Sequence, residues 1–202
     1  METVRDDLFW RALFSCRYDS LESIREEVLK HISMMGLIDE KHSLIKNLKG
    51  GQKQRLVFAK EMIKKKKIII ADEIDTGLDA RESHLLVKTI ADITRKQNLT
   101  TIIISHNLYN IELYDNVVVL AEDAAGVGRI AYSGRVSEMK LFFDEIDYVD
   151  MFLKIIPPEA GGFGMADYYI KKYEDLCMEK QERQGQITKS DSINRQYRPM
   201  LA

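Results

Sequence analysis

Cysteine is scarce in this chain of 202 residues, and its two cysteines, Cys16 and Cys177, lie far apart without the spacing of a metal site. They indicate neither a disulfide framework nor a metal centre, and they suit a reducing cytosol. Long apolar runs are also missing: runs such as residues 68–71 are far shorter than the roughly 20 residues that a membrane-spanning helix needs. The first ten residues contain four charged side chains and no apolar stretch, so they do not resemble a signal peptide.

An excess of charge of one sign is absent too, because 30 basic residues stand against 32 acidic ones, for a net charge of −2. This balance gives no electrostatic footprint for nucleic acid. The remaining composition, 45% hydrophobic and 31% charged, is ordinary for a soluble globular protein. The length predicts one domain followed by a tail.

The first 64 residues are predicted to be mostly helical. Apolar residues recur at helical spacing over residues 4–14 and 19–36, and a third helix is expected over residues 52–64. Asp19 and Glu22 form a candidate capping pair for the second helix, and Gly36 is a natural stop for it.

From residue 65 the pattern becomes that of an α/β sheet. The apolar runs 67–71 and 101–104 are predicted strands, and residues 82–96 between them have the periodicity of a crossover helix. Strand, helix and strand at this spacing imply parallel pairing. A short helix is expected near residues 107–113.

The C-terminal part is expected to begin with a hairpin of strands 116–120 and 129–132. An amphipathic helix over residues 137–154 is then stopped by two prolines at 157 and 158. A glycine-rich linker and a last helix over residues 166–180 follow. The tail from residue 181 is polar and without period, and it is expected to be disordered.

Chemistry is indicated first by Gly50 and Gly51, which stand at the start of the third helix. Without a Cβ in the way, backbone N–H groups and the positive end of the helix dipole can face an anion, although such a pair alone is usually only a turn. An acidic pair, Asp72 and Glu73, follows the first strand, at the edge where open α/β sheets bind their ligands. One carboxylate can hold Mg²⁺ while the next polarises an attacking water.

The alternative for Asp72 is that it only caps the loop that follows it. Asp79 lies in a tight turn before the crossover helix, which is typical of an N-cap. His106 comes directly after the second strand, where it could reach a γ-phosphate. The other histidines are expected on the surface: His31, His42 and His84.

The order of these segments resembles the ATP-binding cassette (ABC) superfamily. The segments are Leu-x-Gly-Gly-Gln-x-Gln-Arg from Leu48, Asp-Glu-x-x-x-Gly-Leu-Asp from Asp72, and Ser-His after the next strand. The resemblance covers roughly residues 3–143 and implies an α/β fold, a partial P-loop NTPase fold in which a helical subdomain precedes a mainly parallel sheet flanked by helices. The implied domains are a helical subdomain 1–64, the C-terminal part of the ATPase core 65–156, a helical extension 157–180 and a disordered tail 181–202.

In that family two nucleotide-binding domains sandwich two ATP molecules head to tail. By position, Gly50, Gly51 and Gln52 resemble the signature motif that meets the γ-phosphate of the opposite domain, with Lys49 at its start. Asp79 resembles the D-loop aspartate, so these five residues are the implied nucleotide-binding set.

Asp72 resembles the Walker B aspartate, which holds Mg²⁺, Glu73 the catalytic base and His106 the switch histidine. ATP and Mg²⁺ are the implied cofactors. The implied function is that of an ATP-binding subunit, or a piece of one, that couples ATP binding and hydrolysis to transmembrane transport.

The implied partners are a second nucleotide-binding domain or a P-loop-bearing chain, and a transmembrane transporter domain, but no nucleic acid. The implied location is cytoplasmic, at the membrane through the transmembrane partner. Residues 130–134, followed by Phe142 and Phe143, resemble the exporter branch that includes the White and multidrug half-transporters.

The sequence departs from the family pattern at three positions and in one motif. Lys49 replaces the usual serine, while Ile74 and Asp75 replace the usual proline and threonine after the acidic pair. No Gly-x-x-x-x-Gly-Lys-Ser/Thr motif occurs in the printed sequence, so the chain by itself is expected to be unable to hydrolyse ATP.

In the family, the P-loop strand lies between the strand that precedes His106 and the strand at 117–120. Without it we expect one of three outcomes: direct pairing across the gap, a strand donated by a neighbouring chain, or low stability with self-association through the open edge into homo-oligomers. Two other function classes stay open. One is a DNA-maintenance ATPase, which the Asp72–Asp75 segment also resembles, and the other is a non-catalytic ABC-like interaction module.

Overall fold

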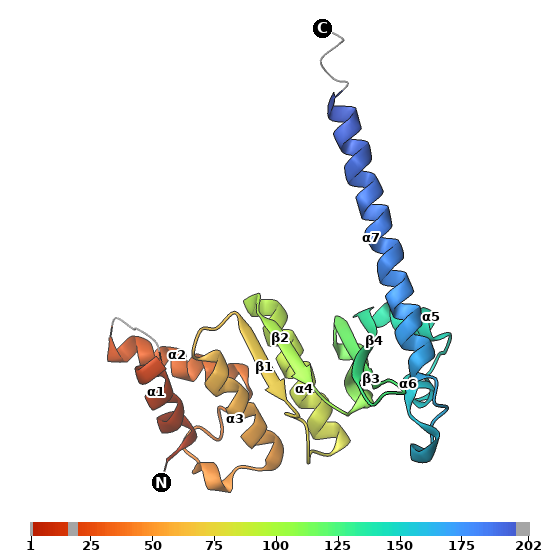
Figure 1. Ribbon diagram of the computed structural model, residues 1–202. Helices are drawn as coiled ribbons and strands as arrows, with labels where there is room; N and C mark the ends of the chain where they lie inside the picture. The colour runs from red at the N-terminus through yellow and green to blue at the C-terminus, as the bar shows by residue number, and fades with distance from the viewer. Residues whose placement is uncertain (1, 16–19, 197–202) are drawn as a thin grey trace. The chain divides into compact units, whose positions relative to one another are not determined.

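The computed structural model describes residues 2–15 and 20–196, with side chains described up to residue 181 (Figure 1). The chain divides into two compact units, residues 1–114 and 115–202, called here the N-terminal and C-terminal units. The N-terminal unit contains both the predicted helical subdomain and the first part of the predicted ATPase core. The division predicted at residue 64 therefore does not coincide with the division between the units.

The helices and strands of the N-terminal unit alternate after an all-helical start. In chain order they are α1 (Val4–Ser15), α2 (Leu21–Met34), the short 3-10 helix η1 (Ile45–Asn47), α3 (Gly50–Met62), β1 (Ile68–Asp72), α4 (Ala80–Gln97), β2 (Thr100–Ile104) and η2 (Leu108–Leu113). The predicted helices and strands of residues 1–113 are thus all present, with ends shifted by a few residues.

The ends of α2 show how local sequence sets a helix boundary. Ser20 is the N-cap, and its side chain accepts from the Ser23 N–H at 3.1 Å, so the capping residue is Ser20 and not the predicted Asp19, which lies outside the described residues. At the other end, Gly36 adopts a positive φ of 63° and the Leu37 N–H donates to the Ile32 carbonyl at 2.9 Å. This is the glycine-terminated helix end that the sequence predicts.

One hydrophobic core joins α1, α2, α3, β1 and α4. Its largest fully buried side chains include Phe58 of α3, Leu8 of α1 and Leu86 of α4. Burial of this kind is the main favourable term in folding, so the helical segment and the strands stabilise one another as a single unit.

His31 corrects the expectation that it lies on the surface, because it is only 5% exposed on the inner side of α2. Its Nδ1 lies 2.8 Å from the Glu27 carbonyl oxygen. Burial lowers the pKa of His31 below its usual range. The helical periodicity of residues 19–36 places position 31 among inward-facing residues, so the misassignment came from residue type rather than from position.

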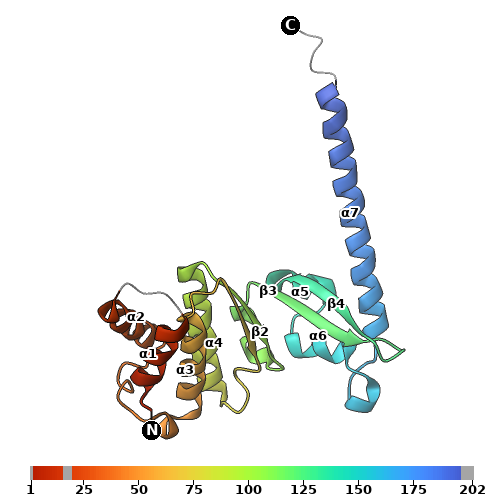
Figure 2. The same cartoon turned by 60° about the vertical axis from the view of Figure 1, so that its left-hand side comes forward.

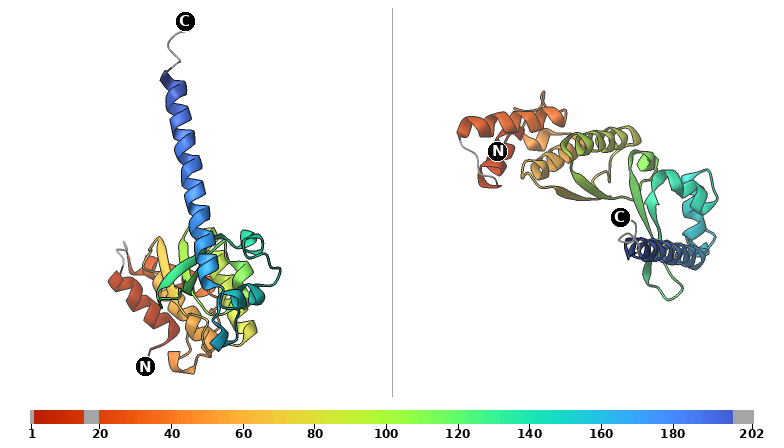
Figure 3. Two further views of the ribbon diagram at one scale, coloured as in Figure 1. Left: turned by 45° about the vertical axis from the view of Figure 1, so that its right-hand side comes forward. Right: turned by 90° about the horizontal axis from the view of Figure 1, so that it is seen from above.

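Strands β1 and β2 pair in parallel from Ile68 opposite Thr100 to Asp72 opposite Ile104, as predicted. Helix α4 covers one face of the two strands (Figures 2 and 3). On the other face four isoleucines are 48–65% exposed: Ile68, Ile70, Ile102 and Ile104. This set is called the exposed isoleucine face.

The described strands of the N-terminal unit are β1 and β2, and those of the C-terminal unit are β3 (Asn116–Glu122) and β4 (Gly128–Arg135); each pair forms a two-stranded sheet. Direct pairing across the predicted gap would join strands of different units, and it stays a prediction. Ile102 and Ile104 are about half exposed rather than fully solvated. Strand donation and self-association stay predictions.

The C-terminal unit starts with the predicted hairpin, in which β3 and β4 pair antiparallel with a register shift between Val119 and Leu120. Asp123 shapes the turn, since its Oδ1 accepts from the backbone N–H groups of Ala125 and Val127, both at 2.9 Å. The elements of the unit are β3 (Asn116–Glu122), β4 (Gly128–Arg135), α5 (Val136–Phe143), α6 (Tyr148–Ile155), the 3-10 helix η3 (Pro158–Ala160) and α7 (Ala166–Gln196).

Two helix predictions in this unit are corrected. The single helix expected over residues 137–154 is split, because Asp144 adopts a positive φ of 53° after α5 and Asp147 then caps α6 through its side chain. The last helix runs to Gln196 rather than to Lys180, so regular structure extends into the tail predicted to lack it. Residues 181–196 contain many good helix formers, such as Gln, Glu, Lys and Arg, and no proline. Residues 197–202 lie outside the described part.

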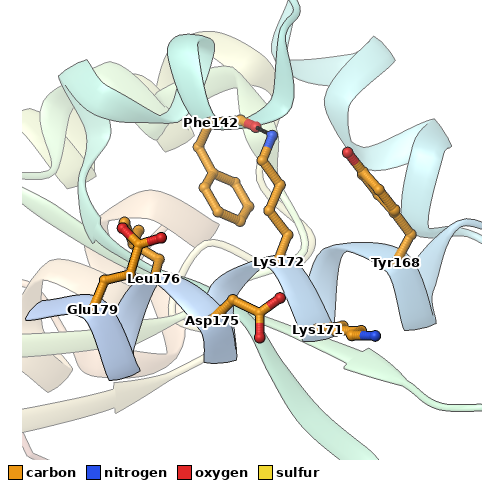
Figure 4. A pocket seen from close by; sticks show the side chains of 7 residues that line it. All are labelled: Phe142, Tyr168, Lys171, Lys172, Asp175, Leu176 and Glu179. Carbon is orange, nitrogen blue, oxygen red and sulfur yellow. Dashed lines mark hydrogen bonds between the residues drawn. The ribbon is translucent and has the colours of Figure 1, made fainter.

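A wide recess of about 530 Å³ lies in the C-terminal unit between α5 and α7 (Figure 4). None of the predicted site residues lines it. Lys172 extends across it, donates a hydrogen bond to the Phe142 carbonyl and holds its ammonium 4.8 Å from the centre of the Phe142 ring. This cation therefore serves to fix α7 against α5.

Candidate nucleotide site

The predicted signature segment opens α3, with Lys49 at the N-cap position and Gly50 and Gly51 in the first turn. Lys49 and Gly50 are exposed. Within the described part of the chain, the N–H groups of the two glycines have no hydrogen-bond acceptor. Gly50 thus leaves the positive end of the helix dipole exposed, whereas Gly51 is buried. Binding of an anion there stays a prediction.

The glycine pair lies against the turn that follows β1. A Cβ on Gly50 would lie 3.2 Å from Leu78 Cδ2, and one on Gly51 would lie 3.5 Å from the Glu82 side chain. The absence of side chains at 50 and 51 therefore brings the start of α3 close to the predicted D-loop turn. The two segments are 30 residues apart in sequence, and only the fold makes them neighbours.

Gln52 was predicted to meet a nucleotide, but in the structure its side chain is used within the unit. Its Oε1 accepts from the Lys49 N–H at 2.9 Å, and its Nε2 donates to Glu40 Oε1 at 2.6 Å. Both ends of the amide thus help to position the helix start. The exposed residues of this segment are Lys49 and Gly50.

Lys49 cannot cap α3, because an ammonium has no acceptor for the N–H groups at the helix start. Replacing Lys49 by serine is expected to raise the free energy of unfolding of the N-terminal unit by about 1 kcal/mol, since a serine oxygen can accept from the Gln52 N–H. Urea denaturation followed by the fluorescence of the single tryptophan, Trp10 in α1, measures the change.

The matched control for this change is Lys53→Ser, one turn further along the same helix and also exposed. There serine replaces a better helix former and has no cap to make, so a loss of a few tenths of a kcal/mol is expected. A Lys49→Ser chain no more stable than Lys53→Ser would contradict the prediction that the helix start lacks a side-chain cap.

The acidic pair lies at the end of β1, where the sequence placed it. Asp72 is the last residue of the strand and is exposed. Glu73 follows with a φ of 47°, and its N–H donates to the Ile104 carbonyl at 2.8 Å, which extends the pairing with β2 by one residue. Both carboxylates are thus held at the carboxyl edge of the parallel pair.

Glu73 and His106 are brought together by this edge. His106 Nε2 lies 3.0 Å from Glu73 Oε1, and Thr76 Oγ1 donates to Glu73 Oε2 at 3.2 Å. The His106 side chain is 86% exposed and that of Glu73 46%, so the pair adds little to stability. Its significance is geometric: two residues predicted as base and switch histidine face the same open space.

Asp79 has the N-cap role that its position in the sequence predicts. It is the N-cap of α4, and its Oδ1 accepts from the Glu82 N–H at 2.7 Å. The residue is exposed, so capping does not bury its carboxylate. A contact with nucleotide stays a prediction for it.

Asp75 is the feature that sequence reasoning missed, since it was treated only as a departure from the family pattern. It is 5% exposed, and it accepts from Ser83 Oγ at 3.1 Å and from Ser105 Oγ at 3.0 Å. The signal was Ser83, a polar residue on the apolar face of α4, because a buried hydroxyl needs a hydrogen-bond partner. Burial, and then the charge of Asp75, raise the pKa of Tyr114 to about 12.

The departure at Ile74 has a simple explanation, because its side chain is 5% exposed and belongs to the core.

No described helix is long and apolar enough to cross a membrane. Nor do the described residues contain a cluster of three or more histidine, cysteine or acidic side chains that could hold a metal by themselves.

Comparison with known proteins shows which families and proteins this chain is similar to. Residues 1–76 match the family model described as ABC transporter. The chain is 32% identical over 121 residues to the methionine import ATP-binding protein MetN of Carboxydothermus hydrogenoformans and 28% identical over 127 residues to the phosphonates import ATP-binding protein PhnC of Escherichia coli.

The chain is similar to ABC transporter ATP-binding proteins.

The matches to MetN and PhnC cover 59% and 62% of this chain but only 34% and 45% of those proteins. The chain thus spans between a third and a half of the length of these ABC relatives. Both are import proteins by name, so the predicted exporter branch is not supported by them.

Solved structures agree on the fold. CbiO1 from Clostridium perfringens, part of the ABC transporter complex cbiONQ, superposes with a TM-score of 0.60 at 23% identity, over 78% of this chain and 59% of that one. The dimeric bacterial ABC transporter cassette MJ0796 gives 0.51 at 20% identity, over 58% of this chain and 52% of that one. The α/β fold, a partial P-loop NTPase fold of the ABC type, is therefore confirmed.

Proposed function

We propose that this chain is the signature-bearing part of an ABC-type ATP site, and that it hydrolyses ATP only together with a P-loop from another segment or chain. The observation that carries the proposal is the 3.0 Å pairing of His106 Nε2 with Glu73 Oε1, beside Asp72 at the carboxyl edge of β1 and β2. Open α/β sheets bind their ligands at this edge.

In this proposal Glu73 accepts a proton from the attacking water, and His106 orients the Glu73 carboxylate and contacts the γ-phosphate. Asp72 suits Mg²⁺, which takes one or two carboxylates together with phosphate and water oxygens. The ion would supply charge neutralisation on the phosphates when bound. No described group nearby supplies a full cradle for the β- and γ-phosphates, which is why a P-loop is required.

The start of α3 serves a different nucleotide in the same proposal. Lys49 and Gly50 are exposed at the start of α3, so the Gly50 N–H and the Lys49 ammonium suit the γ-phosphate of ATP held by a partner nucleotide-binding domain. Lysine at position 49 adds a full positive charge where a hydroxyl is usual. Asp79, at the neighbouring turn, would contact the same partner.

The exposed isoleucine face gives independent support for a covering P-loop lobe. Four isoleucines there are 48–65% exposed on two adjacent strands. Apolar side chains gathered in this way mark a surface that another protein segment covers.

A transmembrane partner at the cytoplasmic face of a membrane completes the proposal. The relatives named above are importers and residues 130–134 resemble exporters, so we restrict the proposal to the shared ATP-binding role.

A chimera tests this function. A segment that carries the Gly-x-x-x-x-Gly-Lys-Ser/Thr motif of an ABC ATP-binding protein would be joined ahead of residue 1, and phosphate release from Mg²⁺-ATP would be measured. The chain alone is expected to show no turnover above background, and the chimera is expected to hydrolyse ATP. A folded chimera that binds but never hydrolyses ATP would favour the non-catalytic module, and robust turnover by the chain alone would contradict the proposal.

A further inference from the structure

Asp75 stands at the centre of a buried hydrogen-bond network that links three segments of the N-terminal unit. Its carboxylate accepts from Ser83 Oγ on α4 and from Ser105 Oγ, the residue before His106. Ser105 Oγ also accepts from the Asn107 N–H at 3.0 Å. The residues on both sides of His106 are therefore hydrogen-bonded, directly or through Ser105, to the Asp75 carboxylate.

Ser83 closes the network from the side of α4. Its hydroxyl donates to Asp75 and accepts from Asn107 Nδ2 at 3.2 Å and from Asn110 Nδ2 at 2.7 Å. One donor and two lone pairs are all that a hydroxyl possesses. Ser83 is 0% exposed, so every bond that it can make is made within the protein.

The charge of Asp75 has no cationic partner among the described residues. Hydroxyl donors alone compensate it, and a buried charge that loses such donors has a large desolvation cost. Hydrogen bonds to an ionised group are also stronger than those between neutral groups. The two serines are thus held at fixed positions relative to the end of β1, and the His106 loop is held with them.

We infer that Asp75 is a positioning residue, which holds the loop 105–107 so that His106 faces Glu73, and which joins this loop to the start of α4 behind the D-loop turn. The inference rests on the proposed function, because a role for the His106–Glu73 pair follows from that function. Asp75 lies two residues after Glu73 but touches neither nucleotide nor water in the mechanism. It acts through Ser105.

The test uses the full chain without nucleotide and is read by NMR. In Asp75→Asn, the Asn107 amide is expected to exchange its hydrogen about tenfold faster, because loss of one charge-assisted network bond is worth about 1.4 kcal/mol. The nuclear Overhauser contact between the His106 ring and the Glu73 side chain is expected to disappear. Exchange of the Val28 and Ile32 amides, which open only with the whole unit, serves as the control.

A merely structural role for Asp75 would accelerate all of these amides together and leave the His106–Glu73 contact intact, and either result would overturn the inference. If Asp75→Asn does not fold, Ser105→Ala removes one donor and is read by the same contact; its retention would also overturn the inference. Because no nucleotide is present, an inactive chimera would count against the proposed function alone.

Discussion

Replacing Glu73 by glutamine is expected to lower ATP turnover by the chimera about 10²- to 10⁴-fold, the range by which a positioned general base accelerates a reaction. Glutamine has the same shape and can keep the contacts with His106 and Thr76, but its amide cannot accept a proton from water. ATP affinity is expected to change little, because the Glu73 carboxylate has no hydrogen-bond donor with which to bind a phosphate oxygen. Phosphate release and nucleotide binding, measured on the same preparation, separate the two effects.

The control is Glu26→Gln, which makes the same chemical change on an exposed site of α2. Turnover of this variant is expected to equal that of the unmodified chimera. If Glu73→Gln also retained full turnover, Glu73 could not be the base. The nucleotide site would then have to use another group at the edge of the sheet.

Replacing Phe58 by alanine is expected to lower the free energy of unfolding of the N-terminal unit by about 3–5 kcal/mol, through lost burial and the cavity left behind. Phe58 is 1% exposed and belongs to the core that joins α3 to β1. It also lines a small recess together with residues of β1 and the acidic pair, so its loss removes packing against the strand that carries this pair. Because small domains are stable by only about 5–15 kcal/mol, this variant should be close to unfolding.

Val57→Ala is the matched control, on the same helix and next in sequence. Val57 is 48% exposed, and alanine is the better helix former, so a change near zero or slightly favourable is expected. Urea denaturation read by Trp10 fluorescence compares the two variants. A loss below about 1 kcal/mol for Phe58→Ala would show that the core can collapse around the missing ring.

Much of the site could be predicted because its residues lie at the ends of regular elements. Gly50 and Gly51 precede a helix, and Glu73 and His106 follow parallel strands, so periodicity and boundary signals placed them at one edge of the sheet. The use of Gln52 within the unit could not be predicted in the same way. Its partner Glu40 is 12 residues away across an irregular loop, and no local pattern fixes where such a loop passes.

The errors in the fold have similar causes. The break between α5 and α6 depends on Asp144 adopting a positive φ, which an amphipathic pattern across residues 137–154 does not show. The helical position of His31 predicts burial, but the surface assignment followed from the polar character of histidine. Periodicity reports which face of an element is apolar, and it reports less well where a continuous pattern is interrupted.

The sequence by itself determined the order of the motifs, the parallel pairing of two strands around a helix and the placement of the acidic pair at a strand end. These are local properties, set by spacing and by helix and strand boundaries. Only the tertiary structure decided that Asp75 is buried and that Ser83 and Ser105, 22 residues apart, bond to the same carboxylate. A buried charge is stabilised by whichever donors the fold brings to it, and that proximity is a property of packing between elements, which spacing along the chain does not contain.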